Sequence, residues 1–274
     1  MSLPLDHVVI RVEDLEQAIA DFSETGFTVQ RGGIHADGTT HHAVIGFADG
    51  SFIDLTASLP DARAVREPRW PHSVQSSGKG FGAFALLTQA VPDSIDTART
   101  RGLHYEGPTP GGRIRPDGTR IEWQSALPIT RDLPLLCSDL TPRFLRSAAG
   151  DAQRHANGAQ GIASVAIVVK DLEASVERYR ALYGNPFGVH RAELPGHAVR
   201  LATFSSGTTT LTLLSPHDTG TPNGVNALTS DLYAHLSTQG EGLFGVTLAT
   251  SHASNARVLP SVLTHGSRLE LAVR

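Results

Sequence analysis

The strongest constraint on the fold is an internal repeat. Residues 5–20 read LDHVVIRVEDLEQAIA and residues 162–177 read IASVAIVVKDLEASVE, so the triplet Asp-Leu-Glu at 14–16 aligns with the same triplet at 171–173. A repeat of this kind predicts a fold built by duplicating one structural unit. His7 of the first copy aligns with Ser164 of the second, which indicates that the two copies do not do the same work.

The repeated unit is predicted to be βαβββ. Alternating side chains over 7–12 favour a strand, and Asp14 is suited to cap the helix that follows. Residues 41–55 favour a hairpin that turns at Asp49-Gly50, a strong two-residue turn signal. The same order recurs from about residues 81 and 162, and in a shortened form from residue 242. The connections 57–79, 141–160 and 217–240 are expected to be irregular.

A βαβββ unit leaves one face of its sheet uncovered by its helix. Two units side by side curl into an open cup, and such a concave face is a natural site for a small molecule. We therefore predict an α+β fold of repeated βαβββ modules forming two curved-sheet cups. The expected domains are residues 1–145, with modules 1 and 2, and residues 158–274, with modules 3 and 4.

Composition narrows the function classes. The chain of 274 residues is 40% hydrophobic and has a formal net charge of −4, which argues against nucleic acid or an anionic membrane surface as the partner. It has no apolar run long enough to span a membrane and no signal peptide pattern at its start. The single cysteine, Cys137, is typical of a reducing compartment, so we expect a cytoplasmic protein.

Several motifs carry a family resemblance. The segments LDHVVIRVEDLEQA and FIDL resemble the vicinal oxygen chelate superfamily, which includes glyoxalase I, extradiol dioxygenases, fosfomycin-resistance proteins and bleomycin-binding proteins. More narrowly, GGIHADGTTHHAVIGFADGSFIDL, RIRPDGTRIEWQ and LPLLCSDLTPR are similar to the glyoxalase-like domain proteins, over roughly residues 5–143. The superfamily places many activities on one scaffold, so the resemblance implies the fold more specifically than the function.

The resemblance implies metal ligands at His7, in the first strand of the unit, and at Asp54, in its last strand. A two-residue turn at Asp49-Gly50 would pair Ile45 with Asp54, which places His41 on the Asp54 face and turns His42 away. The predicted metal ligands are therefore His7, His41 and Asp54, for a divalent ion such as zinc, nickel, manganese or iron.

The other units lack matching ligands. The corresponding pairs are about Ala83 and Cys137 in the second unit, Ser164 and Thr212 in the third, and about Gly245 and Glu270 in the fourth. An extradiol dioxygenase needs a site of two histidines and one carboxylate, which in four-unit members of the superfamily comes from the second pair, so that activity is disfavoured.

Four further side chains are candidates for binding a substrate. Arg11 and Arg113 are suited to an anionic group, His35 is expected near the mouth of the cup, and Trp123 is expected in its wall or in the core. For Arg11, the alternative is a simple ion pair with Asp54. Cys137 is expected to be a buried core thiol rather than a nucleophile.

Two functions stay open at this stage. The first is a glyoxalase-like, metal-dependent lyase or isomerase, with His7 and Asp54 as ligands or bases acting on a small oxygen-rich substrate. The second is a metal-free small-molecule binding or resistance-type sequestering protein, favoured by the lost ligand positions. A structural or regulatory protein with degenerate cups is a third interpretation. Superfamily units often pair across subunits, so the resemblance also allows a homodimer.

Overall fold

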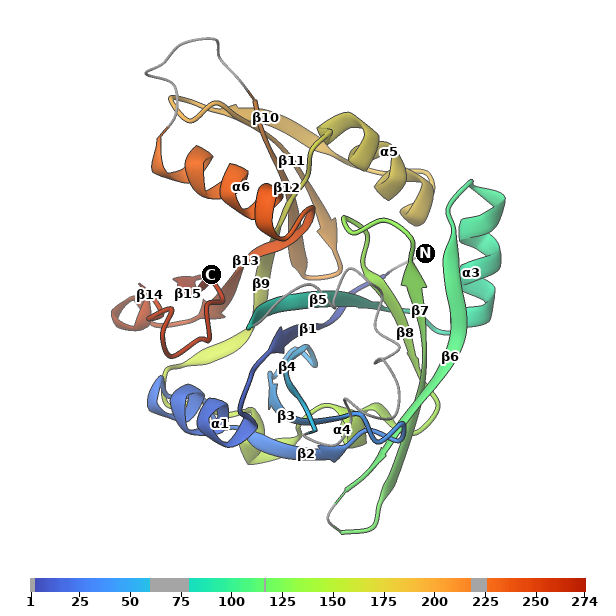
Figure 1. The fold of residues 1–274 in the computed structure, drawn as a ribbon, viewed down its shortest axis with the longest axis vertical. Coiled ribbons are helices and arrows are strands. Elements are labelled where there is room, and N and C mark those ends of the chain that lie inside the picture. The colour runs from blue at the N-terminus through green and yellow to red at the C-terminus, as the bar shows by residue number, and fades with distance from the viewer. Residues whose placement is uncertain (1–2, 60–78, 116, 218–225) are drawn as a thin grey trace.

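Two curved sheets, one from each half of the chain, form the framework of the protein (Figure 1). The computed structural model describes residues 3–59, 79–115, 117–217 and 226–274. The predicted α+β class and the two-sheet arrangement are confirmed, and within the described residues no helix is long and apolar enough to cross a membrane. Most of the connection 57–79 lies outside the described residues.

The N-terminal sheet has eight strands in the order β2-β3-β4-β1-β5-β8-β7-β6. The first unit supplies one half of this order and the second unit the other, with β1 and β5 antiparallel at the centre. The elements are β1 (Leu5–Arg11), α1 (Leu15–Glu24), β2 (Gln30–Ile34), β3 (Thr40–Gly46), β4 (Phe52–Ser58), β5 (Gly80–Leu87), α3 (Val91–Thr100), β6 (Tyr105–Ile114), β7 (Arg120–Pro128) and β8 (Leu135–Asp139).

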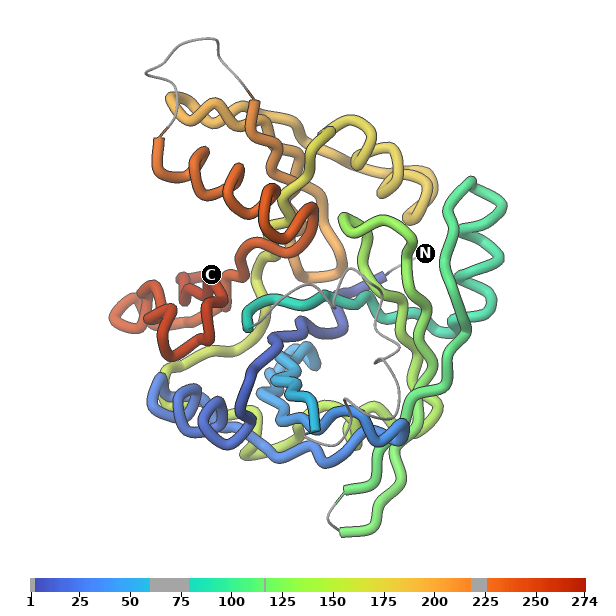
Figure 2. The backbone as a smooth tube through the Cα atoms, viewed as in Figure 1, coloured from blue at the N-terminus to red at the C-terminus, as the bar shows by residue number. Residues whose placement is uncertain are grey.

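This sheet curls until its two edges meet. The edge strands β2 and β6 lie side by side, as the tube in Figure 2 shows. An isolated antiparallel bridge joins His35 to Arg113, and the Ala36 amide donates to the Gly112 carbonyl over 2.8 Å. The predicted open cup is therefore closed along one side into a partial barrel, which brings residues from both units around one interior.

The C-terminal sheet has seven strands in the order β10-β11-β12-β9-β13-β15-β14. A hairpin turns at residues 207–208, where Ser206 pairs with Thr209 at the ends of β11 and β12. The elements are α4 (Arg143–Arg146), the 3₁₀ helix η2 (Gly150–Gln153), β9 (Ala159–Val168), α5 (Leu172–Tyr183), β10 (His190–Leu194), β11 (Val199–Ser206), β12 (Thr209–Pro216), α6 (Ala227–Thr238), β13 (Gly242–Thr250), η3 (Ala253–Asn255), β14 (Arg257–Val258) and β15 (Leu269–Val273).

The repeated helices begin where the sequence predicts. The Asp14 carboxylate accepts from the Glu16 and Gln17 amides over 2.8 and 3.0 Å at the start of α1, and Asp171 accepts from the Ala174 amide over 3.1 Å at the start of α5. Each carboxylate satisfies backbone donors that the first helical turn leaves unpaired. The duplicated Asp-Leu-Glu motif is thus a duplicated helix cap.

Two of the connections expected to be irregular contain helices. Residues 141–160 contain α4 and η2, and residues 217–240 contain α6. The fourth unit is shortened as expected, with only η3 between β13 and β14 in place of an α-helix.

Helix α6 fills part of the second concave face. Its Leu232 is fully buried against Val168 and Leu214, while their sequence neighbours Ile167 and Leu213 pack with α5 on the opposite face. Because α5 corresponds to α1, the face under α6 corresponds to the cup face of the first half. A helix therefore occupies in the second half the side that surrounds a cavity in the first.

One apolar core runs through both halves. The largest buried cluster includes Val8 and Phe22 of the first half together with Ile167 and Tyr179 of the second. The division into domains at 1–145 and 158–274 stays a prediction.

The register of the first hairpin differs from the predicted one. Gly46 pairs with Phe52, so Val44 and not Ile45 lies opposite Asp54. The connection spans residues 47–51 because the Asp49 carboxylate accepts from the Ser51 amide and hydroxyl over 2.9 and 2.6 Å. A one-residue shift moves every side chain of a strand to the other face, which has a direct effect on the site.

Candidate functional site

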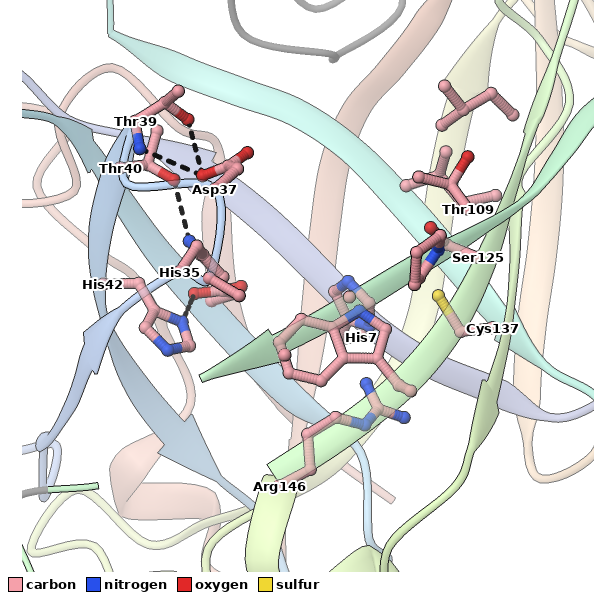
Figure 3. Close-up of a pocket in the computed structure, with 18 of the residues that line it drawn as sticks. His7, His35, Asp37, Thr39, Thr40, His42, Thr109, Ser125, Cys137 and Arg146 are labelled. Atoms are coloured by element: carbon pink, nitrogen blue, oxygen red, sulfur yellow. Dashed lines mark hydrogen bonds and ion pairs between the residues drawn. The ribbon is translucent and has the colours of Figure 1, made fainter. Parts of the chain in front are cut away.

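A cavity of about 350 Å³ lies inside the N-terminal sheet, where the sequence analysis places the site (Figure 3). Six of the chemically functional side chains on its wall come from six strands or their flanking loops. They are His7 of β1, His35 after β2, His42 of β3, Asp54 of β4, Trp123 of β7 and Cys137 of β8.

His7 forms a hydrogen-bonded dyad with its neighbour Asp6. Its Nδ1 lies 2.8 Å from Asp6 Oδ2, and its ring stacks on Phe52 with centroids 4.7 Å apart. Asp6 is fully buried, and burial alone would raise its pKa, but Arg146 and His7 hold that pKa well below the ordinary value. The ionised carboxylate accepts from His7 Nδ1–H, so Nε2 is the ring nitrogen that stays available to a molecule in the cavity.

Asp54 is bound by His42, a residue that the sequence analysis turned away from the cup. His42 Nδ1 lies 2.7 Å from Asp54 Oδ1, and both side chains are buried. Burial alone would raise the pKa of Asp54, but its interaction with His42 lowers it far below the ordinary value. The Asp54 carboxylate is therefore ionised at neutral pH.

His35 completes this side of the cavity. Its Nδ1 lies 2.7 Å from the Thr40 hydroxyl, and its ring lies 4.3 Å from that of His42 and 6.0 Å from that of Trp123, between centroids. Burial is the main cause that lowers the pKa of His35 to about 4. His35 is therefore a neutral imidazole at neutral pH.

The predicted site residues divide into two groups. His7, His35, Asp54 and Trp123 all line the cavity. His41 does not share the face of Asp54, and that expectation is wrong because the true hairpin register pairs Val44 with Asp54 and so puts His42 on the cup side.

The two predicted anion-binding arginines are not on the described cavity wall. Arg11 is the last residue of β1, where it is half-buried. Its backbone lies opposite Thr56 of β4 and Gly80 of β5. Arg113 is buried behind His42, with Nη1 only 2.6 Å from His42 Nε2. It also donates to the backbone carbonyls of Gly32 over 3.3 Å, Arg146 over 2.8 Å and Leu145 over 3.5 Å.

Backbone hydrogen bonds fix the correspondence between the first two units. In the first unit the Val12 amide donates to the Thr56 carbonyl over 3.0 Å, and in the second the Thr88 amide donates to the Cys137 carbonyl over 2.8 Å. Each donor lies three residues before its helix, α1 or α3. Cys137 therefore corresponds to Thr56.

The place of Asp54 in the second unit therefore belongs to Leu135, two residues before Cys137. The expected correspondence of Cys137 with Asp54 is wrong by two residues, whereas Ala83 remains the counterpart of His7. Cys137 does line the cavity, and burial raises the pKa of its thiol to about 12. The second unit thus supplies apolar residues at both ligand positions.

One lining residue that the sequence analysis missed is Arg146. Its guanidinium lies over the rings of Phe52 and Trp123, 5.4 and 6.0 Å from their centroids. It also donates to both oxygens of Asp6 over 2.9 and 3.0 Å and to Asp139 over 2.5 Å. Arg146 lies in a connection with no periodic pattern, so no local signal points to it.

The charges around the cavity are largely paired. Within the described part of the wall, Arg146 is the only lysine or arginine, and two carboxylates already bind it. Asp54 is bound through His42 to the buried cation Arg113. This interior is better matched to an uncharged molecule than to an anion.

Two groups of side chains have ligand-type atoms close enough to share a metal ion. They are Asp6, His7 and Cys137, and His35, His42 and Asp54, each with one atom per residue within 4.8 Å of the others.

Hydrogen bonds already engage key members of both groups. In the second, His42 uses both nitrogens, on Asp54 and on Arg113. In the first, Asp6 accepts from two arginines and the Cys137 pKa favours the thiol over the metal-binding thiolate. In this arrangement, neither group offers three free ligand atoms.

Comparisons with known proteins agree with this architecture. The family model described as a glyoxalase-like domain matches residues 5–183. A hypothetical protein from Staphylococcus aureus superposes with a TM-score of 0.70 at 11% identity, covering 99% of this chain and 100% of its own. A triple mutant of 4-hydroxymandelate synthase from Streptomyces coelicolor superposes with a TM-score of 0.63 at 16% identity, covering 95% and 78%. No curated protein sequence matches the chain.

Proposed function

The chain belongs to the glyoxalase-like domain family, with the fold of the vicinal oxygen chelate superfamily, and from this premise we propose an isomerase- or lyase-type enzyme. Its substrate is a small, oxygen-rich and uncharged molecule, bound in the cavity of the N-terminal sheet. The observation that carries the proposal is the Asp6–His7 dyad, with its 2.8 Å hydrogen bond on the wall of that cavity.

His7 is the general base in this proposal. A buried carboxylate on Nδ1–H fixes the tautomer and stabilises the imidazolium that forms when Nε2 takes a proton. The proton comes from the carbon next to a substrate carbonyl, and His7 then returns it to a neighbouring atom or to a leaving group. Arg146 and Arg143 keep Asp6 ionised by direct ion pairs over 2.9 and 2.5 Å.

Asp54 has a different role, because a carboxylate with so low a pKa is a weak base. We assign it to accept a hydrogen bond from a substrate hydroxyl, which orients the substrate against His7. Trp123 supplies a flat apolar surface for the carbon skeleton.

The family resemblance also implies a divalent ion, but the residues present do not fit one. A metal ligand must offer a free lone pair, and both ring nitrogens of His42 are in hydrogen bonds. The carboxylate of Asp6 is held by Arg143 and Arg146. The proton transfers described above therefore use the side chains of this chain alone.

The test is hydrogen–deuterium exchange of carbon acids. Purified protein is incubated in D₂O with a panel of uncharged α-hydroxy and α-oxo carbonyl compounds, and exchange is followed by NMR. We expect the wild type to exchange hydrogen for deuterium in at least one compound. The exchange rate should fall by about 10²- to 10⁴-fold in His7→Gln and should be unchanged in Glu270→Gln. Glu270 is the matched control because it corresponds to Asp54 in the fourth unit. Exchange that persists unchanged in His7→Gln would overturn the proposal.

The second candidate function is a metal-free binding or sequestering protein. It is favoured by the apolar residues Ala83 and Leu135 at the ligand positions of the second unit. A thermal-shift screen with the same compounds and with aromatic ligands separates the two functions. Stabilisation by aromatic ligands without any exchange supports the binder, whereas exchange that depends on His7 supports the enzyme.

A further inference from the structure

Arg113 determines which nitrogen of His42 carries the proton. A guanidinium group has donors and no acceptor, so the 2.6 Å contact of Arg113 Nη1 with His42 Nε2 requires a lone pair on Nε2. The proton of the neutral ring is then on Nδ1, where it is donated to Asp54 Oδ1 over 2.7 Å. The three side chains therefore form one chain of hydrogen bonds, in which Arg113 donates to His42 and His42 donates to Asp54.

The donor direction of these two hydrogen bonds is incompatible with a metal ion on His42. An ion bound at Nδ1 would move the ring proton to Nε2, where it would face the N–H groups of Arg113. The positive charge of Arg113 next to the ring would also repel a divalent cation. Among the described residues, the loss of His42 leaves only His35 and Asp54 in that ligand group.

The fold holds the hydrogen-bonded chain of Arg113, His42 and Asp54 in place. Arg113 is only 4% exposed, and backbone carbonyls of Gly32 and Arg146 hold its two terminal nitrogens. A methyl group at Gly32 would overlap with both the His42 ring and the Arg113 guanidinium, so the space between β2 and β6 depends on glycine there. The bridge between His35 and Arg113 where the two sheet edges meet fixes the position of the arginine.

We propose that Arg113 is a positioning residue that keeps the His35–His42–Asp54 group free of metal, by holding His42 as the donor to Asp54. The Arg113–His42–Asp54 chain then orients the Asp54 carboxylate in the place where the family resemblance puts a metal ligand. The inference rests on the proposed function for the use of that carboxylate, but the chain itself is tested without any substrate.

The first test is the tautomer of His42 in the wild-type protein. Nitrogen-15 NMR of the imidazoles, assigned with His42→Gln, distinguishes the protonated nitrogen from the one with a lone pair. We expect the proton on Nδ1 and a lone pair on Nε2. A proton on Nε2 would overturn the proposal, and this measurement needs no arginine variant to fold.

The second test is a zinc titration by calorimetry of the wild type, Arg113→Met and Arg115→Met. Arg115 is the matched control, since it lies on the same strand end and also contacts a backbone carbonyl, that of Leu145. We expect Arg113→Met to gain zinc affinity by about tenfold or more, Arg115→Met to behave as the wild type, and Asp54→Asn to cancel the gain.

A wild-type protein that binds zinc as tightly as Arg113→Met, with His42 as a ligand, would contradict the inference. Neither test measures turnover. Failure of the deuterium-exchange test would therefore leave the tautomer result intact, and the two proposals can fail separately.

Discussion

The Asp6 carboxylate lies 2.8 Å from Nδ1 of His7, although neighbours in a regular strand point to opposite faces. The strand is irregular at this point. Leu5 pairs with Leu86 and His7 with Ala85, so Asp6 is an extra residue on β1. A bulge of this kind redirects side chains, and here it provides the catalytic base of the proposed enzyme with a carboxylate partner.

Replacing the Asp6 carboxylate should destabilise the protein strongly. In Asp6→Asn two buried or half-buried arginines, Arg143 and Arg146, lose a charged partner. We expect the free energy of unfolding to fall by about 3–5 kcal/mol, measured by urea denaturation. The control is Asp151→Asn, which removes an exposed ion pair with Arg154 and should leave stability unchanged within error. Equal effects of the two variants would contradict the buried network.

Stability should also fall on mild acidification because of His35. Its pKa in the folded protein is about 4, against an ordinary value of 6.5. Between these values the unfolded chain takes up a proton that the folded protein does not, so the free energy of unfolding falls as pH decreases through this window. The loss of unfolding free energy caused by His35 is about 3 kcal/mol. This loss is absent above about pH 6.5 and complete below about pH 4.

The measurement is urea denaturation of the wild type and His35→Gln at several pH values. The pKa of His155 is also lowered by burial, so the difference between the two proteins isolates the share of His35. Parallel stability curves across this pH range would show that His35 takes up its proton at the same pH in the folded and the unfolded protein.

Replacing Gly32 even by alanine should destabilise the protein. The added methyl group would overlap with the His42 ring and the Arg113 guanidinium. We expect Gly32→Ala to lose about 1–3 kcal/mol of stability and to shift the imidazole resonances of His42. Gly188→Ala is the matched control, because a methyl group there meets no atom within 4 Å. Unchanged His42 resonances in Gly32→Ala would show that the contact is not tight.

Helix α6 should contribute to stability and not to the site. We expect Leu232→Ala, which empties a fully buried position against Val168 and Leu214, to cost about 2–5 kcal/mol. Tyr233→Ala, at the neighbouring and 40% exposed position, should cost much less. Ligand-induced stabilisation of the N-terminal cup should be the same in both variants, and its loss in Leu232→Ala would indicate coupling between the halves.

Local sequence patterns were sufficient for the repeated unit. The family resemblance singled out His7 and Asp54, strand alternation placed both on the cup side, and both line the cavity. The duplicated Asp-Leu-Glu motif correctly marked the starts of α1 and α5. These features depend on backbone geometry and hydrogen bonds within a few residues, so the sequence contains the information that determines them.

Local sequence patterns could not determine the register of the first hairpin. A turn signal at Asp49-Gly50 allows a two-residue or a longer connection, and the choice between them decides whether His41 or His42 faces the cup. The structure has the longer connection, stabilised by the hydrogen bonds of Ser51 to Asp49. A single hydrogen-bonded turn thus changed the identity of a site residue.

The sequence alone was enough to predict a duplicated βαβββ scaffold. The surroundings of His7 and Asp54 depend on how the strands pack in three dimensions. Curling of the sheet brings Arg113 onto His42, 71 positions apart in the chain, and α4 carries Arg146 onto Asp6, 140 positions apart. Such contacts depend on how far a sheet twists and where its edges meet, and these are properties of the whole packed sheet rather than of any one segment.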